Sequence, residues 1–254
     1  MQALMIASIL LSTIVGTIVG LKLLRLASRT RQFPEFAVGG ALFCYAAVAQ
    51  TTLFASSSLG PDASHGHHMT LLASRLLAYY LTLIGLSVFT WQVFGVESHW
   101  RRALTLLIAV STILTIGAAY WASWNQLGTD GQLPLYARFG ASPQYGIVFA
   151  WMSAESLQYY RLMRKRQGLC LADAVVTNRF GVWGVSAGAS SLLIVGLLYV
   201  QLTRNVLLGS DPLSSALISA TGLVNAIGWW LTFMPPAVYT RWLRGPTTQE
   251  GSHG

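Results

Sequence analysis

Residues 3–31 read ALMIASILLSTIVGTIVGLKLLRLASRTR, an apolar run that passes directly into a cluster of basic residues. The hydrocarbon core of a bilayer is about 30 Å thick and a helix rises about 1.5 Å per residue, so about 20 apolar residues are needed to cross it. The run therefore predicts a membrane-spanning helix over residues 3–24. It lacks the basic start of a secretory signal peptide and is too long for its apolar core, so we expect it to stay in the mature protein.

Comparable apolar stretches follow along the chain. They predict six further spans, at 36–58, 69–95, 103–124, 143–162, 180–202 and 215–240. The overall composition agrees, because 54% of the residues are hydrophobic and only 9% are charged, whereas a soluble domain carries about 25% charged residues. We predict an all-α, polytopic integral membrane protein in which residues 1–244 form a seven-helix bundle. Residues 245–254 are predicted to form a disordered cytoplasmic tail.

The basic residues are distributed unevenly over the predicted connections. Only Arg75, Arg138 and Arg204 lie away from the connections that share one predicted side of the membrane; the other basic residues are Lys22, Arg25, Arg29, Arg31, Arg101, Arg102, Arg161, Arg164, Lys165, Arg166, Arg179, Arg241 and Arg244. Cytoplasmic loops carry the excess of Lys and Arg in membrane proteins. The pattern predicts an outer N-terminus, a cytoplasmic C-terminus and a location in the cell membrane. It explains the net charge of +8 without a nucleic-acid partner.

Two charged residues fall inside the predicted hydrocarbon zone, Arg75 in the third span and Glu155 in the fifth. A charge at the centre of an isolated membrane helix costs about 3 kcal/mol on insertion scales, so such residues usually face the bundle interior. We expect both to point inward, with snorkelling of Arg75 to the outer surface as the alternative. Their predicted depths differ, so a direct pair between them is not assumed.

Polar and aromatic residues recur at helical spacing beside these charges. Residues three or four apart share one face of a helix, and the candidate ligand-binding residues chosen on this basis are Arg75, Tyr79, Trp151, Glu155, Tyr159, Asn225 and Trp229. One interpretation is an interior cavity that accepts a small amphipathic ligand. The other is that these stripes are packing seams, because small and hydroxylated residues let membrane helices approach closely.

A run of histidines, His65, His67 and His68, precedes the third span. Imidazole suits zinc, copper and nickel, but we place these residues in an exposed loop without rigid geometry, so they are weak metal candidates. The sequence has no His-Glu-x-x-His, Gly-rich phosphate loop or Gly-x-Ser-x-Gly motif. We therefore predict a protein that is not an enzyme and has no cofactor and no dedicated metal site.

The last span ends with Phe233, Met234, Pro235 and Pro236, followed by Tyr239, Arg241 and Trp242. This segment resembles the Phe-x-Pro-Pro segment, followed by aromatic and basic residues, that closes the seven-helix membrane sensor region of some bacterial histidine kinases. The resemblance implies a sensor-like module that acts through a partner, since the chain carries no kinase domain. A retinal-binding rhodopsin is not expected, because Lys22 and Lys165 both lie at predicted cytoplasmic ends.

Proline removes a backbone donor and kinks or breaks a helix, so Pro235 and Pro236 are also a candidate hinge. The leading hypothesis is a sensory or receptor-like protein that binds a small ligand within the bundle and signals to a membrane or cytoplasmic partner. Two alternatives stay open. One is a small secondary transporter with Glu155 as a proton-coupled carboxylate, and the other is a non-catalytic accessory subunit of a membrane complex.

Overall fold

The computed structural model describes residues 2–58, 64–95, 97–126, 141–204 and 211–244. Residues 127–140, between the predicted fourth and fifth spans, and the predicted tail 245–254 lie outside these ranges. Within them the chain is helical and has no β-strand. In chain order the elements are α1 (Gln2–Thr30), α2 (Phe33–Phe43), the π-helical turn η1 (Cys44–Ala49), α3 (Gln50–Ser58), α4 (His65–Phe94), α5 (His99–Gln126), α7 (Ser142–Gln167), α8 (Ala174–Arg204), α9 (Pro212–Phe233) and α10 (Ala237–Arg244).

In the described part of the chain, six helical segments are long and apolar enough to cross a membrane. They are Gln2–Thr30, Phe33–Ser56, His65–Phe94, His99–Asn125, Ala174–Arg204 and Pro212–Phe233. These segments confirm the all-α class and a multi-pass membrane protein. α7 covers the predicted span 143–162 but falls outside this set, because polar residues such as Gln144, Ser153 and Glu155 interrupt its apolar face.

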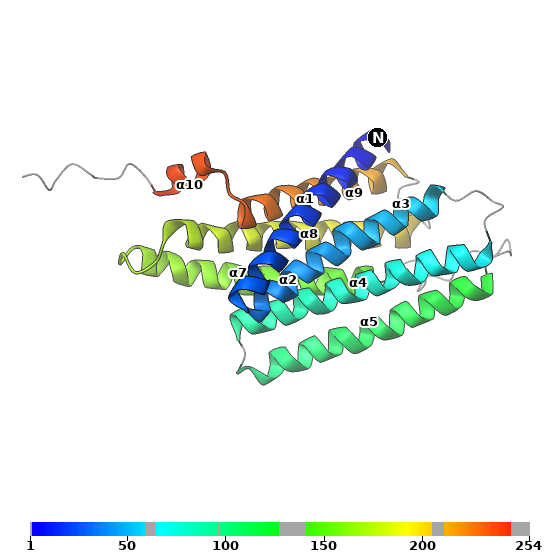
Figure 1. Cartoon of the computed structure of the whole chain (residues 1–254), viewed down its shortest axis with the longest axis horizontal. Coiled ribbons are helices and arrows are strands. Elements are labelled where there is room, and N and C mark those ends of the chain that lie inside the picture. The colour runs from blue at the N-terminus through cyan, green and yellow to red at the C-terminus, as the bar shows by residue number, and fades with distance from the viewer. Residues whose placement is uncertain (1, 59–63, 96, 127–140, 205–210, 245–254) are drawn as a thin grey trace, which may run out of the picture.

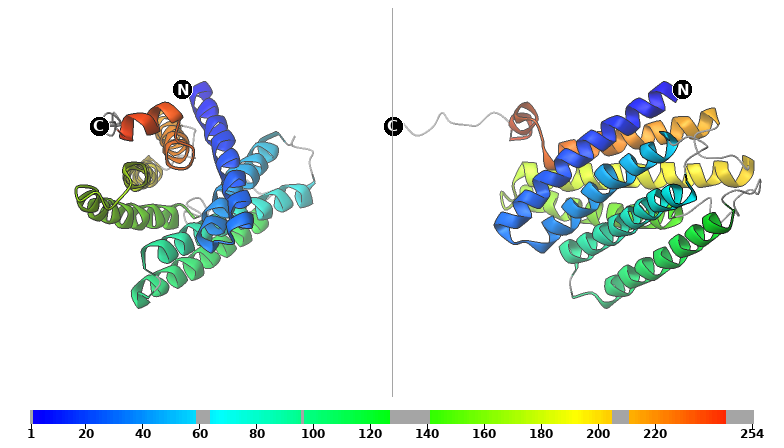
Figure 2. Two further views of the ribbon diagram at one scale, coloured as in Figure 1. Left: turned by 60° about the vertical axis from the view of Figure 1, so that its left-hand side comes forward. Right: turned by 45° about the vertical axis from the view of Figure 1, so that its right-hand side comes forward.

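The long helices form a ring in which most chain neighbours are also neighbours in space. α1 packs on α2, α2 on α4, α4 on α5 and α7, α7 on α8, and α8 on α9, while α9 returns to α1 and closes the ring. In the left view of Figure 2, α7 to α10 lie to the left of α1, the end of α3 lies to its right, and α4 and α5 run below it. α5 lies at the margin of the bundle and packs mainly on α4.

The two ends of the bundle differ in charge. The α1–α2, α4–α5 and α7–α8 turns lie at one end together with α10, while the N-terminus and the end of α3 lie at the other (Figure 1). The first set of turns carries Arg29, Arg101, Arg102 and the Arg164–Arg166 run, so we call it the basic end. The alternation of basic and non-basic connections predicted from the sequence thus corresponds to two opposite ends of the fold.

Small residues set the closest helix contacts. A Cβ on Gly20 of α1 would lie 2.8 Å from the backbone nitrogen of Phe43, and one on Gly85 of α4 would lie 2.7 Å from the carbonyl oxygen of Ala37. Real Cβ atoms do not approach so closely, so glycine at these two positions allows α1, α2 and α4 to pack backbone to backbone. Association through small residues is characteristic of membrane helices.

Two features differ from the sequence-based expectation. α9 ends at Phe233 and a separate helix, α10, begins at Ala237, whereas we predicted one span continuing to residue 240; two consecutive prolines remove the donors needed for continuation. The histidine run lies in the first turn of α4 rather than in a loop, because Ser64 caps that helix by accepting a hydrogen bond from the backbone nitrogen of His67.

Candidate functional site

Three tyrosines from three helical segments meet inside the bundle. The ring centroids of Tyr45 and Tyr79 are 6.3 Å apart, those of Tyr45 and Tyr145 are 6.3 Å apart, and those of Tyr79 and Tyr145 are 6.0 Å apart. Trp229 of α9 packs edge-on against Tyr45 at 6.0 Å, and Phe149 stacks on Tyr145 at 6.2 Å. We call these five residues the tyrosine cluster. It joins η1, α4, α7 and α9.

Local backbone structure places Tyr45 in this cluster. The segment 44–49 is π-helical between two α-helical segments, and an inserted π-turn shifts the rotational phase of the residues on either side of it. Single π-turns inside α-helices are rare and occur frequently at functional sites. Gly16 of α1 makes room for the neighbouring Trp229, since a Cβ there would lie 2.9 Å from the indole ring.

Hydrogen bonds complete the surroundings of the cluster. The Tyr145 hydroxyl donates to the carbonyl oxygen of Tyr79 at 3.3 Å, and Thr82 donates to the carbonyl oxygen of Ala41 at 3.2 Å. One turn before Trp229, Asn225 is buried and accepts a hydrogen bond from Ser190 at 2.9 Å. The cluster therefore offers aromatic faces and phenol groups at the middle of α4, within reach of several helices at once.

A second polar site lies between α5 and α7, closer to the basic end. Arg101 donates through Nε to Glu155 Oε1 and through Nη2 to Glu155 Oε2, both at 2.8 Å. The side chain of Glu155 is 8% exposed and that of Arg101 is 19% exposed. Two parallel bonds between a guanidinium and a carboxylate form the strongest ion-pair geometry available to side chains. The pair holds α5 against α7, and Gln144 reinforces this contact with a bond to Thr115.

Aromatic rings and a glycine surround the ion pair. Trp151 donates from Nε1 to Glu155 Oε1 at 3.3 Å, and Trp100 stacks beneath the Arg101 guanidinium, 5.2 Å from its Cζ. Gly95, where α4 ends, lies against the same guanidinium so closely that a Cβ there would overlap Arg101 Nη1. The guanidinium is therefore enclosed by α4, α5 and α7.

The predicted ligand-binding residues do not form one site in the structure. Tyr79 and Trp229 belong to the tyrosine cluster, with Asn225 next to it. Trp151 and Glu155 belong to the ion-pair site. Tyr159 packs between Phe94 and Phe180 at the basic end, with ring centroids 5.8 and 4.7 Å away. Arg75 is half-buried one turn from Tyr79 and does not pair with Glu155.

Four functional candidates, Tyr45, Tyr145, Phe149 and Arg101, were absent from the sequence-based set. Tyr145 and Phe149 are four residues apart and share one face of α7, but Trp151, Glu155 and Tyr159, the predicted residues of this helix, lie on a different face. Arg101 was missed because we counted it as a loop residue of the cytoplasmic side, whereas it lies in the first turn of α5 and turns inward. A single basic residue at a helix start gives no sequence signal for that orientation.

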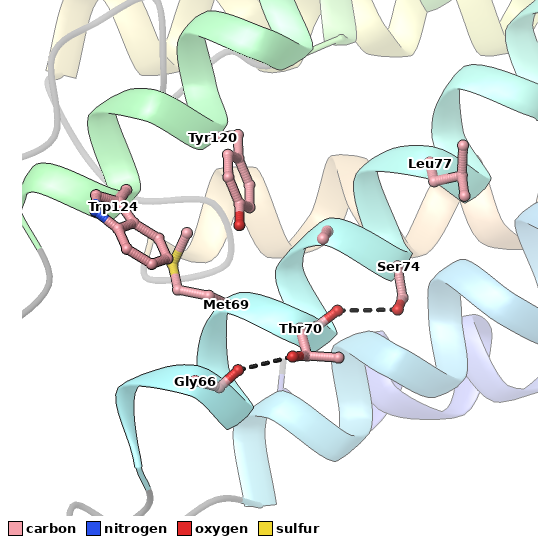
Figure 3. A pocket seen from close by; sticks show the side chains of 8 residues that line it. Gly66, Met69, Thr70, Ser74, Leu77, Tyr120 and Trp124 are labelled. Carbon is pink, nitrogen blue, oxygen red and sulfur yellow. Dashed lines mark hydrogen bonds between the residues drawn. The ribbon is translucent and has the colours of Figure 1, made fainter.

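A groove of about 410 Å³ separates α4 from α5 at the end opposite the basic end. Figure 3 shows Met69, Thr70, Ser74 and Leu77 on α4 facing Tyr120 and Trp124 on α5. Thr70 donates to the carbonyl oxygen of Gly66, and Ser74 donates to that of Thr70, both within α4. These hydroxyls are thus engaged by their own helix, and the groove presents a largely apolar wall.

The histidine run borders this groove. His65 packs edge-on against Trp124 at 4.9 Å, and His67 Nδ1 bonds to the Ser64 hydroxyl at 2.9 Å. Among the described residues, no group of three or more His, Cys, Asp or Glu side chains could hold a metal ion. The helical first turn accounts for this, because it directs neighbouring side chains to different sides.

The predicted hinge residues Pro235 and Pro236 lie between α9 and α10. α10 contacts α8, and Asn178 of α8 donates to the Tyr239 hydroxyl at 2.6 Å. Tyr239 in turn stacks on Trp242 at 6.1 Å. Val238 and Trp242, one helical turn apart, are 69% and 73% exposed. α10 is thus a short helix attached laterally to α8, with an exposed apolar face.

Comparison of the chain with protein-family models, with curated proteins and with solved structures found no match.

Proposed function

We propose that the chain is a seven-helix membrane sensor with an outer N-terminus and a cytoplasmic C-terminus. A small amphipathic ligand binds at the tyrosine cluster, and the change that it causes reaches a partner protein through α10. The observation that carries this proposal is the tyrosine cluster itself, in which α4, α7 and α9 meet the π-helical turn η1. Rings and phenols together suit a ligand with an apolar body and a polar group.

The proposal includes α7 as the seventh span. α7 is antiparallel to α8, and its backbone and side chains bond to that helix at two separated levels. Ser191 donates to the carbonyl oxygen of Gly146 at 2.9 Å, and Ser153 donates to that of Gly184 at 2.7 Å. Because α8 is apolar and long enough to cross the membrane, a helix bonded along it shares its path. The polar residues of α7 then face protein rather than lipid.

The route for the signal runs along α9. Trp229 contacts Tyr45 within the cluster, and four residues later α9 ends, so a rotation of its last turn would act directly on the Pro235–Pro236 linker and α10. Trp183 of α8 packs on Phe233 at 5.1 Å and connects the same turn to α8. The Asn178–Tyr239 bond attaches α10 laterally to α8, and in this proposal α10 is the unit that moves with the last turn of α9.

The hydrogen bonds that Glu155 accepts argue against the transporter alternative. A proton-coupled carboxylate must exchange its proton during each cycle, yet both Glu155 oxygens accept bonds from Arg101, and one accepts a third from Trp151. Such a carboxylate contributes primarily to holding α5 and α7 together. The ion pair is therefore better explained as a structural clamp than as a proton carrier.

Coupling between the tyrosine cluster and α10 tests the sensor proposal without knowledge of the ligand. We would attach spin labels to cysteines at Phe36 and Val238, both exposed, in a chain whose Cys44 and Cys170 are replaced by alanine. Pulsed electron spin resonance then measures the distance between labels in proteoliposomes. Tyr45→Ala should shift or broaden the distance distribution, whereas Leu42→Ala, a cavity at a buried α2 position outside the cluster, should leave it unchanged.

Identical distributions in the parent chain and in Tyr45→Ala would contradict the proposed coupling. Proton uptake provides the second arm, with proteoliposomes loaded with a pH-sensitive dye and subjected to a pH gradient. Under the sensor proposal, proteoliposomes that contain the protein should show the same proton flux as liposomes without protein. A flux that disappears in Glu155→Gln would instead establish the transporter alternative.

A further inference from the structure

A groove of about 480 Å³ lies among α7, α8 and α9 and reaches toward the basic end. At its polar end are Tyr160 and Asn178, and at its apolar end are Val185, Ala189, Val224 and Ile227. Small residues line it, among them Gly181, Ala189 and Gly228, and they leave the space of larger side chains open. The groove therefore combines a narrow apolar channel with a polar opening.

The length of the groove matches one leaflet of a bilayer. Asn178 and Ala189 are separated by eleven residues of α8, which corresponds to about 16 Å along a helix. Half of the hydrocarbon core of a bilayer is about 15 Å thick. An acyl chain that begins beside Asn178 would thus reach the middle of the membrane at Ala189.

Positive charge lies at the polar end. The Arg164 guanidinium is stacked over the Tyr160 ring, 5.9 Å from its centroid, so it is held beside the opening of the groove. Arg guanidinium groups bind phosphate through two parallel bonds. Asn178 adds a side-chain amide at the same opening. Basic pockets between helices on the cytoplasmic side of membrane proteins are typical sites for anionic lipid head groups.

We propose that this groove binds one anionic glycerophospholipid, with the phosphate at Arg164 and Asn178 and one acyl chain along Val185 and Ala189. The proposal requires that the bundle lies in a bilayer but not that it senses a ligand, so it stands apart from the proposed function. Asn178 also donates to Tyr239, so the bound head group would lie next to the attachment point of α10.

Native mass spectrometry of the full chain in detergent tests the site. After delipidation, the protein is titrated with palmitoyl-oleoyl phosphatidylglycerol and, separately, with the phosphatidylcholine of the same chains. Because one basic residue near a membrane surface contributes about a fivefold factor in affinity, we expect the first phosphatidylglycerol to bind at least about fivefold more tightly than phosphatidylcholine. Equal affinity for the two lipids would overturn the proposal.

Paired variants locate the site. Arg164→Gln should remove most of this preference, whereas Arg166→Gln, which removes the same charge from an exposed position in the same run, should retain it. Ala189→Leu should weaken binding of both lipids by filling the channel, while Leu192→Phe, at an exposed position of α8 outside the groove, should not. Equal loss in Arg164→Gln and Arg166→Gln, or no effect of Ala189→Leu, would contradict a defined site.

Folding is checked by comparing the thermal unfolding of each variant with that of the parent chain. Should Arg164→Gln unfold early, Arg164→Lys replaces it, because lysine keeps the charge but cannot present the paired donors of a guanidinium. A folded lysine variant should keep part of the preference for phosphatidylglycerol. If the folded lysine variant instead binds the two lipids with equal affinity, the phosphate contact is contradicted.

Discussion

Glu155 and Arg101 show how a charged residue is accommodated inside an apolar bundle. Removal of one partner from a buried ion pair leaves an uncompensated charge, which costs about 3 kcal/mol or more. We expect Glu155→Gln to lower the free energy of unfolding by about 3 kcal/mol, measured by unfolding in mixed sodium dodecyl sulfate micelles. The double variant Arg101→Met, Glu155→Gln should recover part of this loss, because no buried charge then stays unpaired.

Glu97→Gln provides the control, since Glu97 is an exposed carboxylate in the α4–α5 turn. Surface substitutions of this kind change stability by less than about 0.5 kcal/mol. A loss for Glu155→Gln as small as that of Glu97→Gln would show that the ion pair does not stabilise the bundle.

Gly95 leads to a second prediction at the same site. A methyl group at this position would overlap the Arg101 guanidinium, so Gly95→Ala should displace it from Glu155 and destabilise the protein. In an Arg101→Met background the same substitution should cost much less, because the obstructed group is absent. Residues that share one contact give non-additive effects in such a cycle. Additive unfolding free energies would contradict the proposed overlap.

From the sequence we predicted which residues lie in the interior better than we predicted which residues they contact. Insertion cost alone singled out Glu155 as a polar residue of the fifth span, and the structure places it in the interior. Its partner was not foreseen, because positive residues near helix ends are usually assigned to the membrane surface by the rule that orients the protein. The meeting of Tyr45 with Tyr79 and Tyr145 depends on the phase shift in η1, for which the residues CYAAVA give no known signal.

The break between α9 and α10 determines where α10 lies at the basic end. Replacement of both Pro235 and Pro236 by alanine restores two backbone donors, so we expect α9 to continue into α10 as one helix. This would carry Tyr239 away from Asn178. Hydrogen–deuterium exchange should then show stronger protection of the amides at 234–237 and weaker protection of the first turns of α8.

Pro212→Ala is the matched control for that experiment. Pro212 occupies the first position of α9, where a missing donor has no partner in any case, so exchange at 234–237 should stay as in the parent chain. Unchanged exchange in the double proline variant would indicate that Met234, which terminates α9, breaks the helix for another reason.

Element boundaries were predicted well where apolar length decides them. The first span, expected from residue 3 to 24, lies within α1, and the fourth lies within α5. The last span was extended too far because the hydrophobicity of Ala237, Val238 and Tyr239 continues past the prolines. Hydropathy reports only the preference for lipid, whereas the end of a helix depends on backbone donors.

For the molecule as a whole, the proposed seven crossings would place the three basic turns on the cytoplasmic side of the membrane. Single cysteines at Gln32, Ser98 and Leu169 should react with a membrane-impermeant maleimide only after cells are permeabilised. Cysteines at Ser64 and Asp211 should react in intact cells. Each is introduced after replacement of Cys44 and Cys170, and all five positions are outside the long helical segments. Labelling of Leu169 in intact cells would contradict the crossing by α7.

The way the helices pack around the ring was harder to predict from the sequence than the helices themselves. Neighbouring helices in the chain pack side by side, as short connections require, but the closure of α9 onto α1 depends on small residues at matched heights. Gly222 of α9 lies against Ser8 of α1, where a Cβ would meet the Ser8 carbonyl oxygen at 3.0 Å. Such complementarity appears only when both helices are placed in space.

The polarity of α7 has a consequence for how the chain enters the membrane during synthesis. A ribosome delivers this helix before α8, and its own hydropathy gives it little tendency to partition into lipid. Ser153 finds its acceptor on α8, at the carbonyl oxygen of Gly184, and Glu155 needs the earlier Arg101. We therefore expect α7 to wait at the insertion machinery and to enter together with its successor, so that a chain truncated after residue 172 and released from the ribosome would leave this segment accessible to the aqueous phase.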